Sequence, residues 1–166
     1  MQIHPSRVIP GVAALVLAVI AVISVASVKP DEGGFIKVRP EDVPWREEPG
    51  YGGLQMAVLS GDPAKTGIYV IRVRFPPGLM TRPHRHPEDR HVTVISGTWY
   101  AGEGPLFDPA HTVAMKPGSY MMHPSNAWHF DGAKSEEAVV QIVGYGPSET
   151  VFNAPAEGMT GSSMAK

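Results

Sequence analysis

Short runs that alternate apolar and polar residues, separated by glycine and proline, recur along most of the chain. In the clearest run, IYVIRVRF, the odd-numbered positions from Tyr69 to Phe75 are all apolar, whereas Arg72 and Arg74 occupy positions between them. Successive side chains of a strand point to opposite faces. The apolar set is therefore expected to face a core.

Runs of this kind predict strands at 54–59, 69–75, 91–96, 98–101, 119–123, 127–130 and 138–143. No stretch between them carries a convincing helical period. Many short strands at regular spacing, with turn residues between them, are typical of an antiparallel barrel or sandwich. The fold class is therefore predicted to be all-β.

The N-terminus follows a different pattern. Arg7 precedes an uncharged run from Val8 to Val28, and small residues stand near its end at Ser24 and Ala26. Residues 1–26 are therefore interpreted as a signal peptide, with the mature chain beginning near Ser27 and exported to the periplasm. The alternative is a retained N-terminal helix that anchors the protein in the membrane, because the run is long enough to span a bilayer.

The remaining chain divides into three parts. Residues 27–58 are rich in proline, glycine and charge, with Trp45 as the main apolar side chain, and they predict an extended arm. Residues 59–155 carry the strand pattern and predict the barrel. Residues 156–166 have little apolar content and are expected to be disordered. The arm could cover a sheet edge or reach a second subunit, and we expect a homodimer.

Composition narrows the function classes. The chain has 166 residues, seven histidines and a formal net charge of −2, and its basic residues form no stripe, so nothing favours nucleic-acid binding. It contains no cysteine, which excludes disulfides, thiolate zinc sites and a lipoprotein anchor. A single domain is the default for this length.

Two histidines in GLMTRPHRHPEDRHVTVISG suggest a metal site. His84 and His86 are two positions apart, so in an extended chain their side chains share a face. A third ligand must come from elsewhere, and His129, in KPGSYMMHPSNAWHFDGA, is the obvious candidate.

These two segments resemble the two-part signature of the cupins, G-x5-H-x-H-x(3,4)-E-x6-G and P-G-x5-P-x-G-x2-H-x3-N. The first part is matched by Gly78, His84, His86 and Gly97, and the second by Pro117, Gly118, Pro124 and His129. The resemblance covers roughly residues 59–152. It implies an antiparallel double-stranded β-helix, the jelly-roll cupin barrel, with a divalent metal bound by His84, His86 and His129.

Three positions depart from the signature. Arg90 stands at the glutamate position, Asn126 replaces the second-motif glycine, and Ala133 replaces the last asparagine. Strand parity points Arg90 inward with Val92 and Val94. A guanidinium close to a dication is repulsive, so this exchange removes a ligand and weakens metal affinity unless a carboxylate neutralises the charge.

Two arrangements would supply that neutralisation. A structural ion pair could join Arg90 to Glu88, Asp89 or Asp131 in the resting protein. Alternatively, Arg90 could clamp an anionic substrate beside the metal, which would make it a catalytic residue.

His123, just before Pro124, is a second candidate catalytic residue. It could replace the missing carboxylate as a fourth ligand or act as the inward base, and the alternative is a histidine that only hydrogen-bonds. His91 and His111 are expected on the surface. Candidates for the remaining cavity lining are Phe75, Met80, Tyr100, Tyr120, Met122, Trp128 and Gln141.

Three neutral imidazoles suit Fe, Mn, Ni, Cu or Zn by ligand softness, and the sequence does not choose among them. Similar three-histidine cupins include dioxygenases, so the leading expectation is an oxidoreductase acting on a small anionic molecule. A noncatalytic small-molecule binding or sensing cupin is one alternative. A metal-dependent isomerase or lyase, which needs a general base, is another.

Overall fold

The computed structural model describes residues 28–153 of the chain. The elements along this part are η1 (Pro40–Asp42), β1 (Arg46–Glu47), β2 (Gln55–Ser60), β3 (Gly67–Phe75), β4 (His84–Arg85), β5 (Arg90–Ser96), β6 (Trp99–Glu103), β7 (Val113–Met115), β8 (Tyr120–His123), β9 (His129–Gly132), β10 (Ala138–Gly146) and β11 (Val151–Phe152). The predicted signal peptide or anchor and the predicted tail lie outside the described residues.

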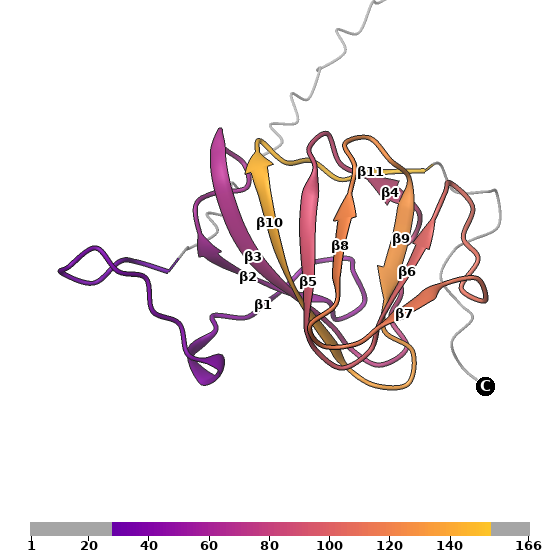
Figure 1. Cartoon of the computed structure of the whole chain (residues 1–166), viewed down its shortest axis with the longest axis horizontal. Coiled ribbons are helices and arrows are strands. Elements are labelled where there is room, and N and C mark those ends of the chain that lie inside the picture. The colour runs from indigo at the N-terminus through magenta and orange to yellow at the C-terminus, as the bar shows by residue number, and fades with distance from the viewer. Residues whose placement is uncertain (1–27, 154–166) are drawn as a thin grey trace, which may run out of the picture.

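The strands form two antiparallel sheets that curve face to face (Figure 1). One sheet has the order β1-β2-β3-β10-β5-β8, and the other has the order β11-β4-β9-β6-β7. Between residues 28 and 153, no helix is long and apolar enough to cross a membrane. The predicted all-β jelly roll is confirmed, and the predicted strand runs all lie in it.

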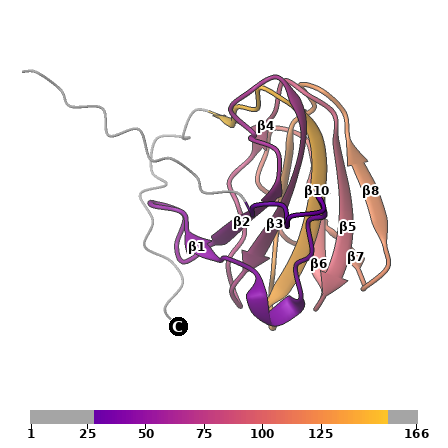
Figure 2. The same ribbon diagram turned by 90° about the vertical axis from the view of Figure 1, so that its left-hand side faces the viewer.

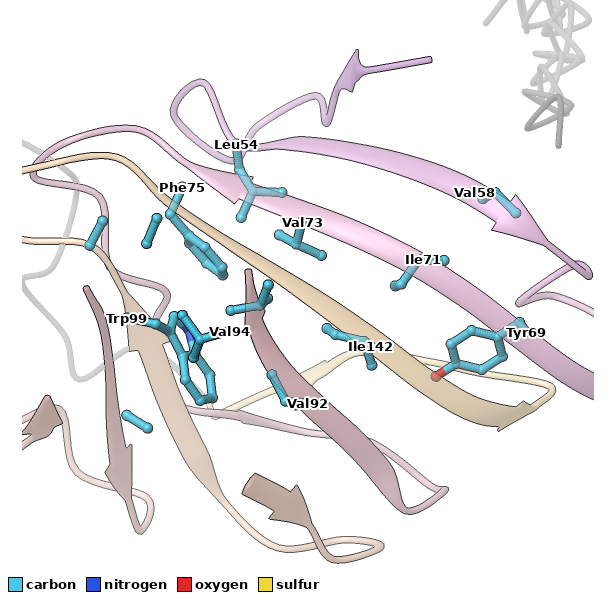
Figure 3. Close-up of a cluster of buried hydrophobic side chains, with 14 residues drawn as sticks. Leu54, Val58, Tyr69, Ile71, Val73, Phe75, Val92, Val94, Trp99 and Ile142 are labelled. Atoms are coloured by element: carbon cyan, nitrogen blue, oxygen red, sulfur yellow. The ribbon is translucent and has the colours of Figure 1, made fainter. Parts of the chain in front are cut away.

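The core fills the space between the sheets (Figure 3). Ile71, Ile142 and Val92 stand opposite one another on β3, β10 and β5, and all three are buried. The expected inward face of β3 is confirmed, because Tyr69 and Phe75 at its two ends are also buried. Trp99 on β6 closes the core from the second sheet and is 1% exposed.

The later part of the arm, from Val38 to Trp45, packs on the outer face of the six-stranded sheet (Figure 2). Val43 and Trp45 cluster with Ala57 and Leu59 of β2, and the Arg74 guanidinium lies 4.1 Å from the centroid of the Trp45 ring. The arm thus covers apolar side chains that alternate with the core-facing ones. Strand β2 pairs with β3 from residue 55 onward, so the barrel sheet begins before the boundary expected at residue 59.

Two of the departures from the cupin signature have a structural explanation. Asn126 has φ 60°, a left-handed conformation that asparagine adopts more readily than most residues, so it preserves the turn in which the signature has glycine. Ala133 is fully buried in the core cluster, where a larger polar side chain would need a partner.

Gly97, between β5 and β6, is the turn by which the chain passes from one sheet to the other. Its φ is 69°, and a Cβ there would lie 1.9 Å from the carbonyl oxygen of Glu137. Gly97→Ala is expected to lower the free energy of unfolding by at least about 2 kcal/mol more than Gly104→Ala does. Gly104 also has positive φ but opens to space, so it controls for backbone strain alone. Urea unfolding of the two variants measures the difference, and equal losses would contradict the packing argument.

Candidate metal centre and cavity

His84, His86 and His129 meet at one end of the barrel. His84 on β4 stands opposite His129 on β9, and His86 follows two residues after His84. One ligand atom from each of the three lies within 4.8 Å of the others, and the side chains are buried, with exposed fractions of 7%, 4% and 4%. The structure thus brings together the three predicted ligands, which could hold a metal ion.

Backbone carbonyls orient all three rings. The Nδ1 atoms of His84, His86 and His129 hydrogen-bond to the carbonyl oxygens of Arg82 at 2.8 Å, Glu149 at 2.8 Å and Ala127 at 3.0 Å. A carbonyl can only accept, so each Nδ1 must carry the proton, and each Nε2 keeps a free lone pair. This is the tautomer that a metal-binding imidazole needs.

The cluster favours neutral imidazoles. Burial lowers the pKa of His84 to about 4, and burial together with the positive charge of Arg90 lowers that of His86 to about 2. Burial also lowers the pKa of His129. At neutral pH these rings do not need to lose a proton before binding a cation.

His123 ends β8 and points inward beside His129, with 3.8 Å between the ring centroids. Burial, and then the neighbouring His129, lowers its pKa to about 2. Within residues 28–153 its Nε2 has no hydrogen-bond partner. His123, His129 and Asp131 form a second group whose ligand atoms lie within 4.8 Å of one another.

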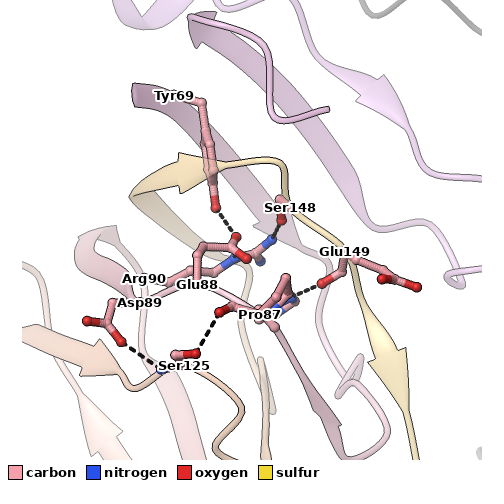
Figure 4. A network of polar contacts seen from close by, with 9 residues as sticks. Tyr69, Pro87, Glu88, Asp89, Arg90, Ser125, Ser148 and Glu149 are labelled. Carbon is pink, nitrogen blue, oxygen red and sulfur yellow. Dashed lines mark hydrogen bonds and ion pairs between the residues drawn. The ribbon is translucent and has the colours of Figure 1, made fainter. Parts of the chain in front are cut away.

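Arg90 points inward from the start of β5 and is neutralised by Glu88 (Figure 4). Its Nε donates to Glu88 Oε1 at 2.9 Å, and its Nη2 donates to the Ser148 hydroxyl. The Tyr69 hydroxyl also donates to Glu88 Oε1, at 2.6 Å. Of the three carboxylates expected as partners, the structure selects Glu88. Asp89 instead accepts from the backbone N–H of Ser125.

The network fixes the charge state of its members. Burial would raise the pKa of Glu88, but hydrogen bonds from Tyr69, Ser148 and Arg90 outweigh it, so the net shift is downward. Burial raises the pKa of Tyr69 to about 12, and Glu88 contributes to the rise. At neutral pH the group is therefore a carboxylate and guanidinium pair with a neutral phenol.

A cavity of about 230 Å³ opens beside the histidines, and its walls differ in chemistry. The six-stranded sheet contributes apolar side chains, among them Ile71, Val92 and Ile142. His84, His86, His129 and Asp131 face these side chains from β4, β9 and the turn after β4, and burial raises the pKa of Asp131. Arg90 on β5 and His123 on β8 are polar members of the six-stranded sheet.

Most of the predicted lining was wrong. Phe75 lines the cavity, whereas Met80, Tyr100, Tyr120, Met122, Trp128 and Gln141 do not. On β8 the inward positions are Met121 and His123, so Tyr120 and Met122 lie on the outer face. Gln141 accepts a hydrogen bond from Arg72 on the outside of the sheet. His91 and His111 are exposed, as predicted.

The sequence did not reveal Ser148 and Glu149 as site residues. They lie between β10 and β11 and have no motif of their own, yet one contacts Arg90 and the other His86. Their place at the site follows from the pairing of β11 with β4, which no pattern in the sequence indicated.

The fold and the histidine cluster together define a cupin. A family model for the ChrR cupin-like domain matches residues 34–149, and the chain belongs to this family. Among curated protein sequences, none gives a significant match.

Several solved structures share the fold at low sequence identity. The polyketide cyclase RemF from Streptomyces resistomycificus is 20% identical with a TM-score of 0.58, covering 72% of this chain and 87% of that one. The DMSP lyase DddQ from Ruegeria pomeroyi DSS-3 is 19% identical with a TM-score of 0.55, covering 69% and 62%. KdgF from Halomonas sp. is 19% identical with a TM-score of 0.51, covering 65% and 90%. At these identities the likeness shows the fold alone.

The buried imidazoles predict acid sensitivity of the metal-free protein. A histidine whose folded pKa is depressed takes up its proton only on unfolding, so stability is full above the unfolded value of 6.5 and falls as the pH drops toward the folded value, about 4 for His84. We expect roughly several kcal/mol to be lost across this window. His84→Asn should flatten the slope. Urea unfolding as a function of pH measures how the free energy of unfolding changes. A slope unaltered by His84→Asn would contradict the claim that the buried, neutral His84 contributes to the acid sensitivity.

Proposed function

We propose that the protein binds one divalent metal through His84, His86 and His129 and acts on a small anionic molecule. The observation that carries this proposal is the set of three hydrogen bonds from Nδ1 to a backbone carbonyl. Each bond leaves one Nε2 lone pair in a buried cluster. The free-energy cost of burying these acceptors is offset only when they bind a metal ion or a hydrogen-bond donor.

The donor set suits Fe, Mn, Ni, Cu or Zn, because imidazole nitrogen is a borderline ligand and no thiolate is present. When bound, such an ion supplies a Lewis acid and a template with positions open for other ligands. The chain's own contribution is the neutral charge of the three rings and their fixed orientation.

Arg90 is proposed to bind the anionic group. Its contacts with Glu88 and Ser148 use two of the five guanidinium N–H donors, which leaves three without an acceptor among the described residues. Two parallel N–H groups match a carboxylate or a similar planar anion. The apolar wall from β3, β5 and β10 excludes water and so strengthens this pairing.

Oxidative chemistry on that molecule is the proposed reaction class. It is supported by a site with three protein ligands, which leaves room for substrate and dioxygen together. One specific observation favours the noncatalytic binding alternative: Arg90, already paired with Glu88, occupies the position of the signature's glutamate. For an isomerase or lyase, His123 would be the base, because its Nε2 has no partner in the described part of the chain.

Metal analysis tests the first part of the proposal. Untagged protein should contain near-stoichiometric metal by plasma mass spectrometry, and His84→Ala or His129→Ala should weaken its affinity at least about 100-fold, because each removes a direct ligand and not merely a supporting contact. His91→Ala, at an exposed histidine, is the matched control. A wild type that stays empty after reloading would contradict the proposal.

Substitution of Arg90 tests the second part. In a screen of small carboxylates with the metal-loaded protein, Arg90→Gln should weaken binding of a hit roughly 10–100-fold, the loss expected for a charged hydrogen bond. Arg72→Gln, on the outer face of β3, is the control. Oxygen consumption with the hit supports oxidation, turnover without oxygen supports a lyase or isomerase, and binding without turnover supports the noncatalytic alternative. Equal affinities of wild type and Arg90→Gln would refute the role of Arg90.

A further inference from the structure

Residues 148–152, here called the C-terminal segment, contact the histidine cluster and Arg90 from a distant part of the sequence. In Figure 4 Ser148 points toward Arg90, whereas the side chain of its neighbour Glu149 is directed away from Arg90. The segment then enters β11, where Phe152 stands opposite His84 and its ring centroid lies 5.7 Å from that of His84. Ser148, Glu149, Thr150 and Phe152 also line the cavity.

The three carbonyls that orient the histidines are not equivalent. Arg82 and Ala127 each lie two residues from the histidine that they orient, so these two contacts form within a single turn of the chain. Glu149 lies 63 residues from His86. Only His86 therefore depends on a separate segment for the orientation of its ring.

Few packing contacts attach this segment to the barrel. The segment contributes no residue to the core cluster, and its side chains are half-buried or exposed. Hydrogen bonds hold it, including Ser148 N–H to Pro63 O at 2.7 Å and Asn153 N–H, just beyond it, to Pro83 O at 2.9 Å. The two-residue pairing of β11 with β4 and the contacts of the Phe152 ring with Tyr51, His84 and Arg82 complete the attachment. Segments with so few apolar contacts open at a free energy well below that of global unfolding.

We propose that the C-terminal segment is a positioning element that closes one wall of the cavity. Metal binding at His86 stabilises this segment in its closed position. The proposal rests on the proposed metal site. When the segment opens, His86 loses the acceptor that fixes its tautomer and ring orientation, and Arg90 loses its contact with Ser148 at the same time.

Thermodynamic linkage makes the effect reciprocal. If the closed segment raises metal affinity by a given factor, then metal raises the closing equilibrium by that factor. Loss of an outer partner of a metal-binding histidine costs about 10–100-fold in affinity, which sets the expected size. The segment would then open readily in the metal-free protein and close when metal is bound, which also sets the orientation of Arg90.

Hydrogen exchange of the full chain, metal-free and with one equivalent of Zn²⁺, tests the proposal. Peptides that cover residues 148–153 should exchange at least about 10-fold more slowly with zinc. The turn at 116–119, between β7 and β8, is the internal control and should change little. Unchanged exchange at 148–153 with stoichiometric zinc bound would overturn this inference and leave the proposed metal site standing. Failure to bind zinc would overturn both.

The reciprocal measurement uses Phe152→Ala, which loosens the segment without removing a ligand. It should speed exchange at 148–153 in the metal-free protein and weaken zinc affinity about 10-fold by calorimetry. Tyr145→Ala, at an exposed aromatic residue of β10, is the matched control and should bind zinc as the wild type does. Wild-type zinc affinity in Phe152→Ala, despite faster exchange, would also overturn the linkage.

Discussion

Hydrogen bonds from histidine Nδ1 atoms to backbone carbonyls are the interactions on which the site depends. Four imidazoles are buried within a few ångströms of one another, and burial lowers the pKa of each. Neutral rings can pack this way only if their N–H groups find acceptors, and for three of them the acceptor is a carbonyl. The backbone just before β4, β9 and β11 is therefore as much a part of the site as the side chains.

Electrostatics explains how an arginine can stand where the signature has a glutamate. An unpaired guanidinium beside a dication would oppose metal binding, but Glu88, two residues earlier, lies against Arg90 in a partly buried ion pair. Tyr69, neutral because burial raises its pKa to about 12, supports Glu88 from β3. The exchange has thus changed a metal-binding position into a polar group that carries no net charge and retains free donors.

The two sheets contribute differently to stability and to the candidate site. Apolar rows such as Ile71, Ile142 and Val92 make the six-stranded sheet a stable wall, whose outer face the arm covers in part. The short strands of the second sheet position the three predicted ligands, His84, His86 and His129, and β4 and β11 are only two residues long. Pairing there provides little stability of its own, so the polar end of the barrel is held by specific contacts more than by buried area.

The sequence by itself predicted the strands and an antiparallel barrel or sandwich, because side-chain alternation is a local property. The resemblance to the cupin signature implied the barrel and the combination of His84 and His86 with His129. Strand parity also pointed Arg90 inward. Only the tertiary structure decided that Glu88 neutralises Arg90, that Met121 and not Tyr120 faces inward on β8, and that Glu149 orients His86. The physical reason is that the phase of a short strand and the partner of a distant carbonyl depend on register between strands, which no local pattern encodes.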